Sequence, residues 1–277
     1  MPRLLNFEKP IATLEKQLET LVARSASPAD FEFDPVILAL RKKIAEARAG
    51  LISSLTPQEL ARLAHHPDRP TAHDYIRDIF TDVIEIKGDR IETDDDAIFC
   101  GFATIDAIKC VVIAQQKGQG GNNAKSAAFR KALRAARLAE KFRLPLVTLV
   151  DTADDLPNMG AEPIAQTIRA FTTLETPILS VIIGEGGTST ALAIGIADRT
   201  LMLENAYYPS AAPRTAPELL TRGFIDGIVP EPPGGAHLDI SAAAAALYEA
   251  ISTALEELTA MPIATLLATR GRRGEGR

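Results

Sequence analysis

The chain has 277 residues, 46% of them hydrophobic and 24% charged, and its net charge at pH 7 is −6. This composition is ordinary for a globular protein, and the negative charge gives no general electrostatic footprint for DNA or RNA. Cys100 and Cys110 cannot build a four-thiolate zinc site, and we expect both to be buried, reduced thiols. The N-terminus has no signal-peptide core, and no apolar stretch approaches the roughly 20 residues that cross a bilayer. We therefore expect a cytoplasmic protein with no membrane or nucleic-acid partner.

Residues 1–82 are predicted to form a helical arm and a connector. Apolar residues recur at helical spacing over 11–21, and again over 37–44 after a proline-containing break. Residues 56–80 have the pattern of a capped helix, a proline-bounded loop and a second short helix. Two amphipathic helices need a surface to lie against, so we expect the arm to pack on the main domain or on a partner subunit.

Residues 83–260 are predicted to form an α/β domain, because short apolar runs alternate there with helical segments. Two strands, a helix and then alternating strands and helices favour a spiral of ββα units over a doubly wound nucleotide fold. The predicted strands are Ala97–Ile105, Cys110–Ala114, Leu146–Val150, Ile178–Ile183, Thr200–Leu203 and Ile225–Val229. The predicted helices are Lys125–Phe142, Glu162–Leu174, Thr188–Ala197 and Ser241–Leu258. Residues 261–277 end in a basic, glycine-rich stretch, and we expect them to be a disordered tail.

The stretch GEGGTSTALAIG at 184–195 lies between a predicted strand and a predicted helix. It is not a dinucleotide fingerprint, because no third glycine follows Gly184 and Gly186 at the required spacing, and no Gly-Lys-Ser/Thr follows either. What remains is a turn whose main-chain N–H groups can face an anionic oxygen, such as a thioester enolate. A glycine turn that serves only close helix packing is the open alternative.

Two more polar, glycine-bearing loops follow predicted strands, QQKGQGGNN at 115–123 and DTADDLPNMGAE at 151–162. Lys117 and Gly118 could hold a phosphate or carboxylate, or belong to a solvated surface loop. Three such strand ends suggest one shared site at the carboxyl edge of the sheet. The histidines and the acidic run at 92–96 lack a metal-ligand spacing, so no metal site is expected. No G-x-S-x-G elbow supports a hydrolase.

Several segments, taken in order, resemble the α subunit of bacterial acetyl-CoA carboxylase carboxyltransferase. They include NFEKPIATLEKQLETL, LARLAHHPDRP, QQKG, LPLVTLVDT, GAE, GEGG with ALAIG, and IDGIVPEPPGGAH, and they run from about residue 6 to residue 237. The resemblance implies a crotonase-like ββα spiral with an N-terminal helical arm. It also implies a heterotetramer with a zinc-ribbon-bearing β-like subunit, carboxybiotin on a biotin carrier protein, and an acyl-CoA or acyl carrier protein substrate.

The resemblance assigns roles to three groups of residues. Main-chain amides of one turn would stabilise the oxyanion, and two loops would contact the biotin and the acyl substrate. The expected catalytic residues are Gly186, Gly187, Thr188 and Ser189. The expected biotin-binding residues are Lys117, Gly118 and Thr190. The expected substrate-binding residues are Gln116, Asp154, Asp155 and Gly160.

The sequence departs from the family on the loops that would shape the cleft. Ser189 and Thr190 replace two glycines, and their β-carbons would narrow the pocket and restrict the backbone. ADDLPN replaces Pro-Gly-Ala-Tyr-Pro-Gly, and the loops after QKG and after the tyrosine pair are shorter. A retained scaffold with a rewritten site indicates altered chemistry or substrate. Three functions stay open: a biotin-dependent carboxyltransferase subunit, a biotin-independent acyl-thioester decarboxylase or related enolate-stabilising enzyme, and a non-catalytic partner of a β-like subunit.

Overall fold

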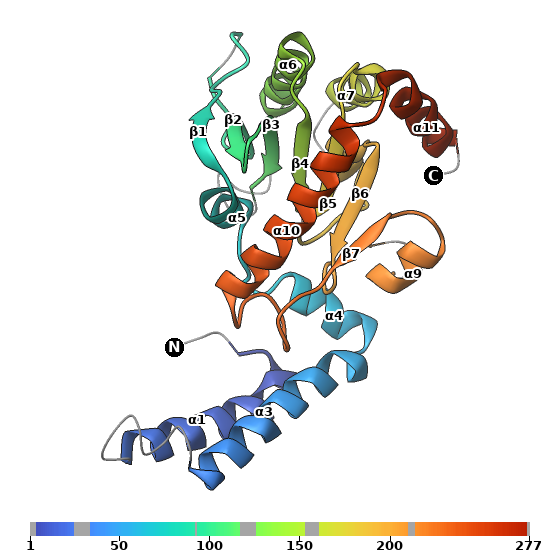
Figure 1. The fold of residues 1–277 in the computed structure, drawn as a ribbon. Coiled ribbons are helices and arrows are strands. Elements are labelled where there is room, and N and C mark those ends of the chain that lie inside the picture. The colour runs from blue at the N-terminus through green and yellow to red at the C-terminus, as the bar shows by residue number, and fades with distance from the viewer. Residues whose placement is uncertain are drawn as a thin grey trace.

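The computed structural model describes residues 4–24, 34–91, 93–116, 126–152, 161–209 and 214–275 (Figure 1). Its centre is a seven-stranded sheet in the order β1-β2-β3-β4-β5-β6-β7. The pairs β1–β2 and β2–β3 are antiparallel, and the remaining pairs are parallel. The strands are β1 Thr81–Glu85, β2 Ile98–Ile105, β3 Ile108–Gln115, β4 Leu146–Val150, β5 Ile178–Ile182, β6 Arg199–Leu203 and β7 Gly227–Val229.

The six predicted strands are confirmed as β2 to β7, with small shifts at their ends. Strands β4 and β5 are buried at every residue, as continuous apolar runs are when helices cover both faces of a parallel sheet. Strand β1 was not predicted. All five of its residues are exposed, so no buried apolar face marks it in the sequence, and it forms by pairing with β2 at the edge of the sheet.

Helices cover both faces of this sheet. On one face lie α6 (Ser126–Phe142), α7 (Ala161–Thr173) and α8 (Ser189–Gly195), and on the other lie α5 (Ala72–Ile79) and α10 (Ile240–Thr259), which crosses the front of the sheet in Figure 1. The order β2-β3-α6, followed by alternating strands and helices, confirms the predicted ββα pattern. A short helix, α9 (Ala216–Thr221), packs beside β7.

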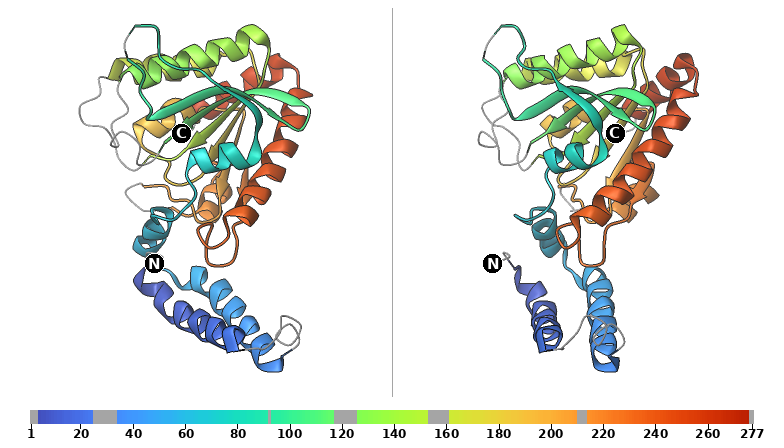
Figure 2. Two further views of the ribbon diagram at one scale, coloured as in Figure 1. Left: turned by 90° about the vertical axis from the view of Figure 1, so that its left-hand side faces the viewer. Right: turned by 60° about the vertical axis from the view of Figure 1, so that its left-hand side comes forward.

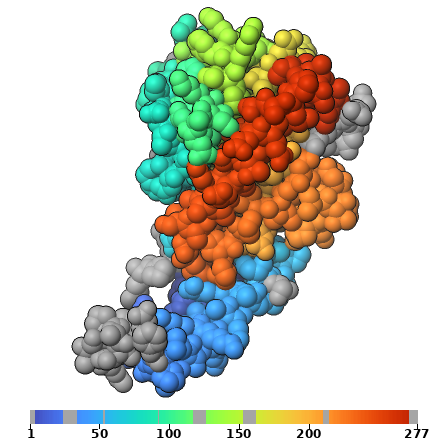
Figure 3. Space-filling view, in the orientation of Figure 1, coloured from blue at the N-terminus to red at the C-terminus, as the bar shows by residue number. Residues whose placement is uncertain are grey.

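The N-terminal residues form a helical arm that projects from the body of the molecule (Figures 2 and 3). A short 3-10 helix, η1 (Asn6–Glu8), leads into α1 (Lys9–Arg24), which lies beside α3 (Pro35–Ser54). Asp34 caps α3, because its Oδ1 accepts the Val36 N–H at 2.7 Å. Helix α4 (Pro57–Ala64) then leads to the body and begins with a capping box of Thr56 and Glu59. Helices therefore occur in the stretches of residues 1–82 where the sequence predicts them.

The prediction of a disordered C-terminal tail is wrong for residues 263–275, which form helix α11 (Ile263–Glu275). The reason is Arg270, whose side chain is 1% exposed. Its Nη1 donates to the carbonyls of Phe171 and Leu174, both at 2.8 Å, and its Nη2 contacts Asp198 Oδ2 at 2.6 Å. A basic, glycine-rich stretch is typical of solvated charges. The guanidinium of Arg270 instead donates to carbonyls at the end of α7 and pairs with a buried carboxylate.

Across the described part of the chain, no single helix combines the length and apolarity needed to span a membrane. Only α10 together with Ile263–Arg270 meets the length and composition criteria, and this pair bends by 113° at its break. In the fold, the apolar side of α10 packs on the body of the protein through the buried residues Leu247, Ile251 and Leu255. Packing against the core therefore accounts for the apolar character of α10.

Candidate functional site

The carboxyl ends of β3, β4 and β5 meet at one edge of the sheet and are joined by polar contacts. Gln115, the last residue of β3, accepts the Asp151 N–H on its Oε1 at 3.2 Å and donates from Nε2 to the Thr190 carbonyl at 3.1 Å. Asp151, which follows β4, accepts the Glu185 N–H on Oδ1 at 3.0 Å. Three separate segments are thus fixed relative to one another around the glycine turn after β5.

The glycines of this turn are required by their surroundings. A β-carbon on Gly184 would lie 2.1 Å from Asp151 Oδ1, so the buried carboxylate leaves no room for a side chain. Gly187 has φ +92°, and a β-carbon there would lie 2.7 Å from the ring of Tyr208. Close packing therefore explains both glycines, while the direction of the main-chain N–H groups is a separate property of the turn.

The amides of the turn differ in how they are used. The Gly186 N–H donates to the Tyr207 carbonyl at 3.0 Å, whereas within the described residues no hydrogen bond satisfies the N–H of Gly187 or Thr188. Ser189 does have a polar interaction. An apolar cavity of about 130 Å³ lies beside Gly186 and Gly187. The Gly187 residue thus lies beside a small cavity at the edge of the sheet, and Thr188 follows it in the chain.

Three threonine hydroxyl groups at the turn are linked by hydrogen bonds. Thr152 Oγ1 lies 2.6 Å from Thr188 Oγ1, which lies 3.0 Å from Thr190 Oγ1. Thr188 also caps α8, because its hydroxyl accepts the Ala191 N–H at 3.1 Å. For this reason α8 begins at Ser189, one residue after the predicted start. Thr190 is 2% exposed, so its side chain belongs to the internal hydrogen-bond network.

The connector between the arm and the body holds the end of β5. Arg69 donates from Nε and Nη2 to the Ile183 carbonyl, at 3.2 and 3.0 Å, and from Nη1 to Glu231 Oε2 at 2.8 Å. Burial alone would raise the pKa of Glu231, but Arg69 outweighs it and holds this pKa below its usual value. His65 contacts the buried carboxylate of Glu185. These contacts were not predicted, because no spacing pattern links residues so far apart in the chain.

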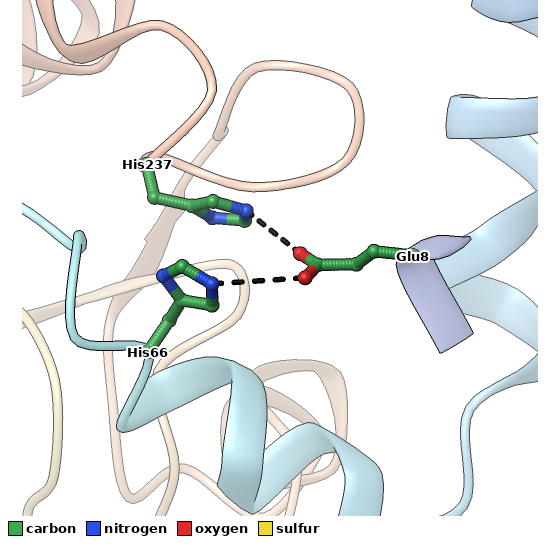
Figure 4. A group of neighbouring side chains, drawn as sticks. All are labelled: Glu8, His66 and His237. Carbon is green, nitrogen blue, oxygen red and sulfur yellow. Dashed lines mark hydrogen bonds and ion pairs between the residues drawn. The ribbon is translucent and has the colours of Figure 1, made fainter. Parts of the chain in front are cut away.

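A second cluster that the sequence did not indicate joins Glu8, His66 and His237 (Figure 4). His237 Nε2 lies 2.8 Å from Glu8 Oε1, and His66 Nε2 lies 3.6 Å from Glu8 Oε2. The centroids of the two rings lie 4.0 Å apart, and the rings stack with an interplanar angle of 24°. His66 Nδ1 also accepts the Asp68 N–H at 3.1 Å.

The histidine nitrogens of this Glu8 cluster contact the carboxylate, and the possible ligand atoms of the three residues lie within 4.8 Å of one another. Burial alone would raise the pKa of Glu8, but its contacts with His237, the Leu5 N–H and His66 bring that pKa below its usual value. Since Glu8 lies in the arm, His66 in the connector and His237 in the body, the cluster fastens the arm to the rest of the protein.

Comparison with known proteins places this site in a family. A family model described as acetyl co-enzyme A carboxylase carboxyltransferase-like matches residues 4–222 and 211–275. The chain is 37% identical to the acetyl-coenzyme A carboxylase carboxyl transferase subunit alpha of Methylococcus capsulatus, over 97% of this chain and 94% of that protein. The corresponding subunit of Edwardsiella ictaluri is 36% identical, over 97% and 96%. The chain belongs to the carboxyltransferase α-subunit family of acetyl-CoA carboxylase.

Solved structures of carboxyltransferases and a related decarboxylase share the fold. Transcarboxylase 12S with methylmalonyl-coenzyme A and methylmalonic acid bound superimposes with a TM-score of 0.58 at 18% identity, covering 73% of this chain and 44% of that chain. The Pseudomonas malonate decarboxylase hetero-tetramer in complex with coenzyme A gives a TM-score of 0.52 at 13% identity, covering 65% and 86%. The predicted crotonase-like α/β fold is confirmed.

The residues expected from the family resemblance fall into two groups. The structure places Gly186, Gly187, Thr188, Ser189 and Thr190 together at the strand-to-helix turn. Gln116 follows β3 at the same edge and is 6% exposed, and neither polar atom of its side chain has a partner among the described residues. The other expected residues, Lys117, Gly118, Asp154, Asp155 and Gly160, lie outside the described ranges.

Proposed function

We propose that this chain is the α-type half of a carboxyltransferase that moves a carboxyl group between carboxybiotin and the enolate of an acyl-CoA or acyl carrier protein thioester. The observation that carries the proposal is the pair of amides at Gly187 and Thr188, which have no hydrogen-bond partner among the described residues, at the edge where three strand ends meet. The membership of the chain in the acetyl-CoA carboxylase family supports the same reaction.

The residues present fit the biotin group. Bound carboxybiotin supplies the carboxyl group for transfer, and a ureido ring offers a carbonyl acceptor and an N–H donor. The side-chain amide of Gln116 is a buried donor and acceptor with neither atom satisfied in the described structure, which suits a ligand of that kind. Lys117, Gly118 and Thr190 are the residues that we assign to biotin from the family resemblance, and Gln116, which we assign to the acyl substrate, directly precedes Lys117.

The catalytic contribution that we assign to this chain is electrostatic. Within the turn Gly186–Ser189, the N–H groups of Gly187 and Thr188 would donate to an oxygen that gains negative charge, and one such donor can lower a barrier by about 3 kcal/mol. Neutral amides held by a rigid turn need no reorganisation when the charge develops. Asp154, Asp155, Gly160 and Gln116 are the positions that we assign to acyl-substrate binding.

The proposal includes partners. The zinc-ribbon-bearing β-like subunit would bind the acyl thioester opposite the turn, and a biotin carrier protein would deliver the carboxyl group, in an α2β2 assembly. Leu192 on α8 is 44% exposed beside the turn, where a β-like subunit could cover it. No general base is assigned to a side chain of this subunit.

A second candidate is a biotin-independent acyl-thioester decarboxylase or related enolate-stabilising enzyme. Two positions favour it, because Ser189 and Thr190 carry β-carbons where the family resemblance expects glycines. In such an enzyme the same amides would hold the enolate left by loss of CO2, and the space for biotin would no longer be needed.

The deciding experiment is purification of the full chain with its β-like partner, followed by assays with malonyl and acetyl thioesters in the presence and absence of carboxybiotin. Transfer that depends on both partner and biotin supports the proposal. Loss of CO2 from the malonyl thioester without biotin supports the second candidate. Turnover that belongs to the β-like subunit alone, and is unaffected by Gly187→Val in this chain, contradicts both and leaves a non-catalytic role.

A further inference from the structure

Glu185 is held at both its main chain and its side chain, directly before the two glycines of the turn. Its N–H donates to Asp151 Oδ1 at 3.0 Å, and its carbonyl accepts the Thr152 N–H at 2.9 Å. Its side chain is 5% exposed and points to His65. Because the next two residues have no side chains, their position depends strongly on the contacts that hold Glu185.

His65 reaches this carboxylate from another part of the fold. It is the C-cap residue of α4, and its side chain is 35% exposed, so solvent protons have access to it. Its Nε2 contacts Glu185 Oε2. In the same connector, Arg69 binds the carbonyl of Ile183. The connector therefore holds the chain on both sides of Gly184.

The buried carboxylate makes the charge of the imidazole important. A carboxylate that is nearly excluded from water needs a counter-charge or a full set of hydrogen bonds. An imidazolium supplies both a charge and a donor, whereas a neutral imidazole supplies at most the donor. Histidine is also the side chain whose charge ordinarily changes between about pH 5 and 8.

We propose that His65 is a positioning residue: its contact with the Glu185 carboxylate fixes the glycine turn whose main-chain amides we assign to the reacting oxygen. The inference rests on the proposed function for its effect on turnover, but not for its effect on the turn. Tyr207, whose ring lies edge-on to His65 at 6.4 Å, and Asp151, which accepts the Glu185 N–H, are also close to this pair.

The kinetic test uses the full chain reconstituted with its β-like partner, with malonyl-CoA and biotin as substrates. His65→Ala should lower kcat about tenfold, with much less effect on the KM for malonyl-CoA, because a misplaced turn weakens transition-state stabilisation more than substrate binding. His65→Arg should restore kcat, because an arginine side chain can donate to the same carboxylate and neutralise it. His73→Ala is the matched control, since His73 contacts Phe99 on the body and not the turn.

The second test needs no activity. Hydrogen–deuterium exchange of residues 184–192 in the isolated full chain should become faster in His65→Ala and should match the wild type in His65→Arg. Unchanged exchange and unchanged kcat in His65→Ala would overturn the inference, as would a folded His65→Arg variant that resembles His65→Ala in both measurements. A wild type that shows no transfer, but in which exchange responds as expected, would contradict the proposed function and support this role of His65.

Discussion

The edge of the sheet around the glycine turn and the projecting helical arm are built in opposite ways. At the edge, residues far apart in the chain converge, as with Asp151 on Glu185 and Arg69 on Ile183. The arm is made of local helix signals, and the ion pair of Glu15 with Arg48 joins its two long helices. The edge therefore depends on the whole fold, whereas the arm can form its helices locally and depends on the Glu8 cluster for its attachment.

The largest effect that would test this comparison is expected from Arg69→Met. The substitution leaves Glu231 buried without its counter-charge and should lower the free energy of unfolding by about 3–5 kcal/mol in urea titrations. The control is Arg77→Met on α5, whose side chain is 65% exposed in its ion pairs, and this substitution should change the free energy of unfolding far less than Arg69→Met does. Equal losses in the two variants would show that the buried pair has no special role.

The next largest effect is expected from Gly187→Ala. The new β-carbon would meet Tyr208 at a backbone φ of +92°, so we expect a loss of about 1–3 kcal/mol in thermal or urea unfolding. Gly195→Ala is the matched control, because nothing lies within 4 Å of a β-carbon there, and it should be neutral or stabilising by up to about 1 kcal/mol. A Gly187→Ala protein as stable as the control would contradict the strained geometry of the turn.

A smaller effect, with a defined pH dependence, is expected from Glu8→Gln, which should lower stability by about 1 kcal/mol at neutral pH through loss of a charge-assisted hydrogen bond. The folded-state pKa of Glu8 is below the ordinary value of 4.5. Its stabilising contribution is therefore complete above that ordinary value and is lost as the pH falls through the folded pKa. Urea titrations of both proteins from pH 7 to pH 3 should show the difference shrinking only at the acidic end. A difference that grows on acidification would contradict this assignment.

The smallest effect is expected at the ion pair between the two arm helices. Glu15→Gln removes a charge from a contact whose two side chains are about one third exposed. The free energy of unfolding should therefore fall by less than about 1 kcal/mol. Circular dichroism and urea unfolding would measure it. A loss as large as that of Arg69→Met would mean that the arm depends on long-range contacts as much as the edge does.

The sequence predicted helices and strands correctly where a local hydrophobic pattern corresponds to burial in the structure. Strand β5 was predicted because its apolar run is buried on both faces, and α3 because apolar residues recur at helical spacing. Strand β1 was missed because its residues are all exposed. Helix α11 was missed because the composition at the end of the chain gives no sign that Arg270 is buried.

The site was also predictable only in part, because contacts between distant segments leave no local pattern in the sequence. The glycines located the turn, but their necessity comes from Asp151 and Tyr208, which approach it from other segments. His65 and Arg69 lie in a stretch that resembles the family, yet no periodicity shows that they hold the end of β5. Contacts of this kind are set by tertiary packing, which a pattern along one chain does not encode.

The placement of Arg270 also has a consequence for biosynthesis. Its guanidinium closes the end of α7, from which it is separated by about a hundred positions, as the 99-residue interval to Phe171 shows. Because synthesis proceeds from the N-terminus, these carbonyls have no donor from Arg270 until the codon of Arg270 has been translated. A polypeptide that ends shortly before this codon would lack the contact between α11 and the end of α7. Quality-control proteases could recognise the carbonyl groups left without a donor there.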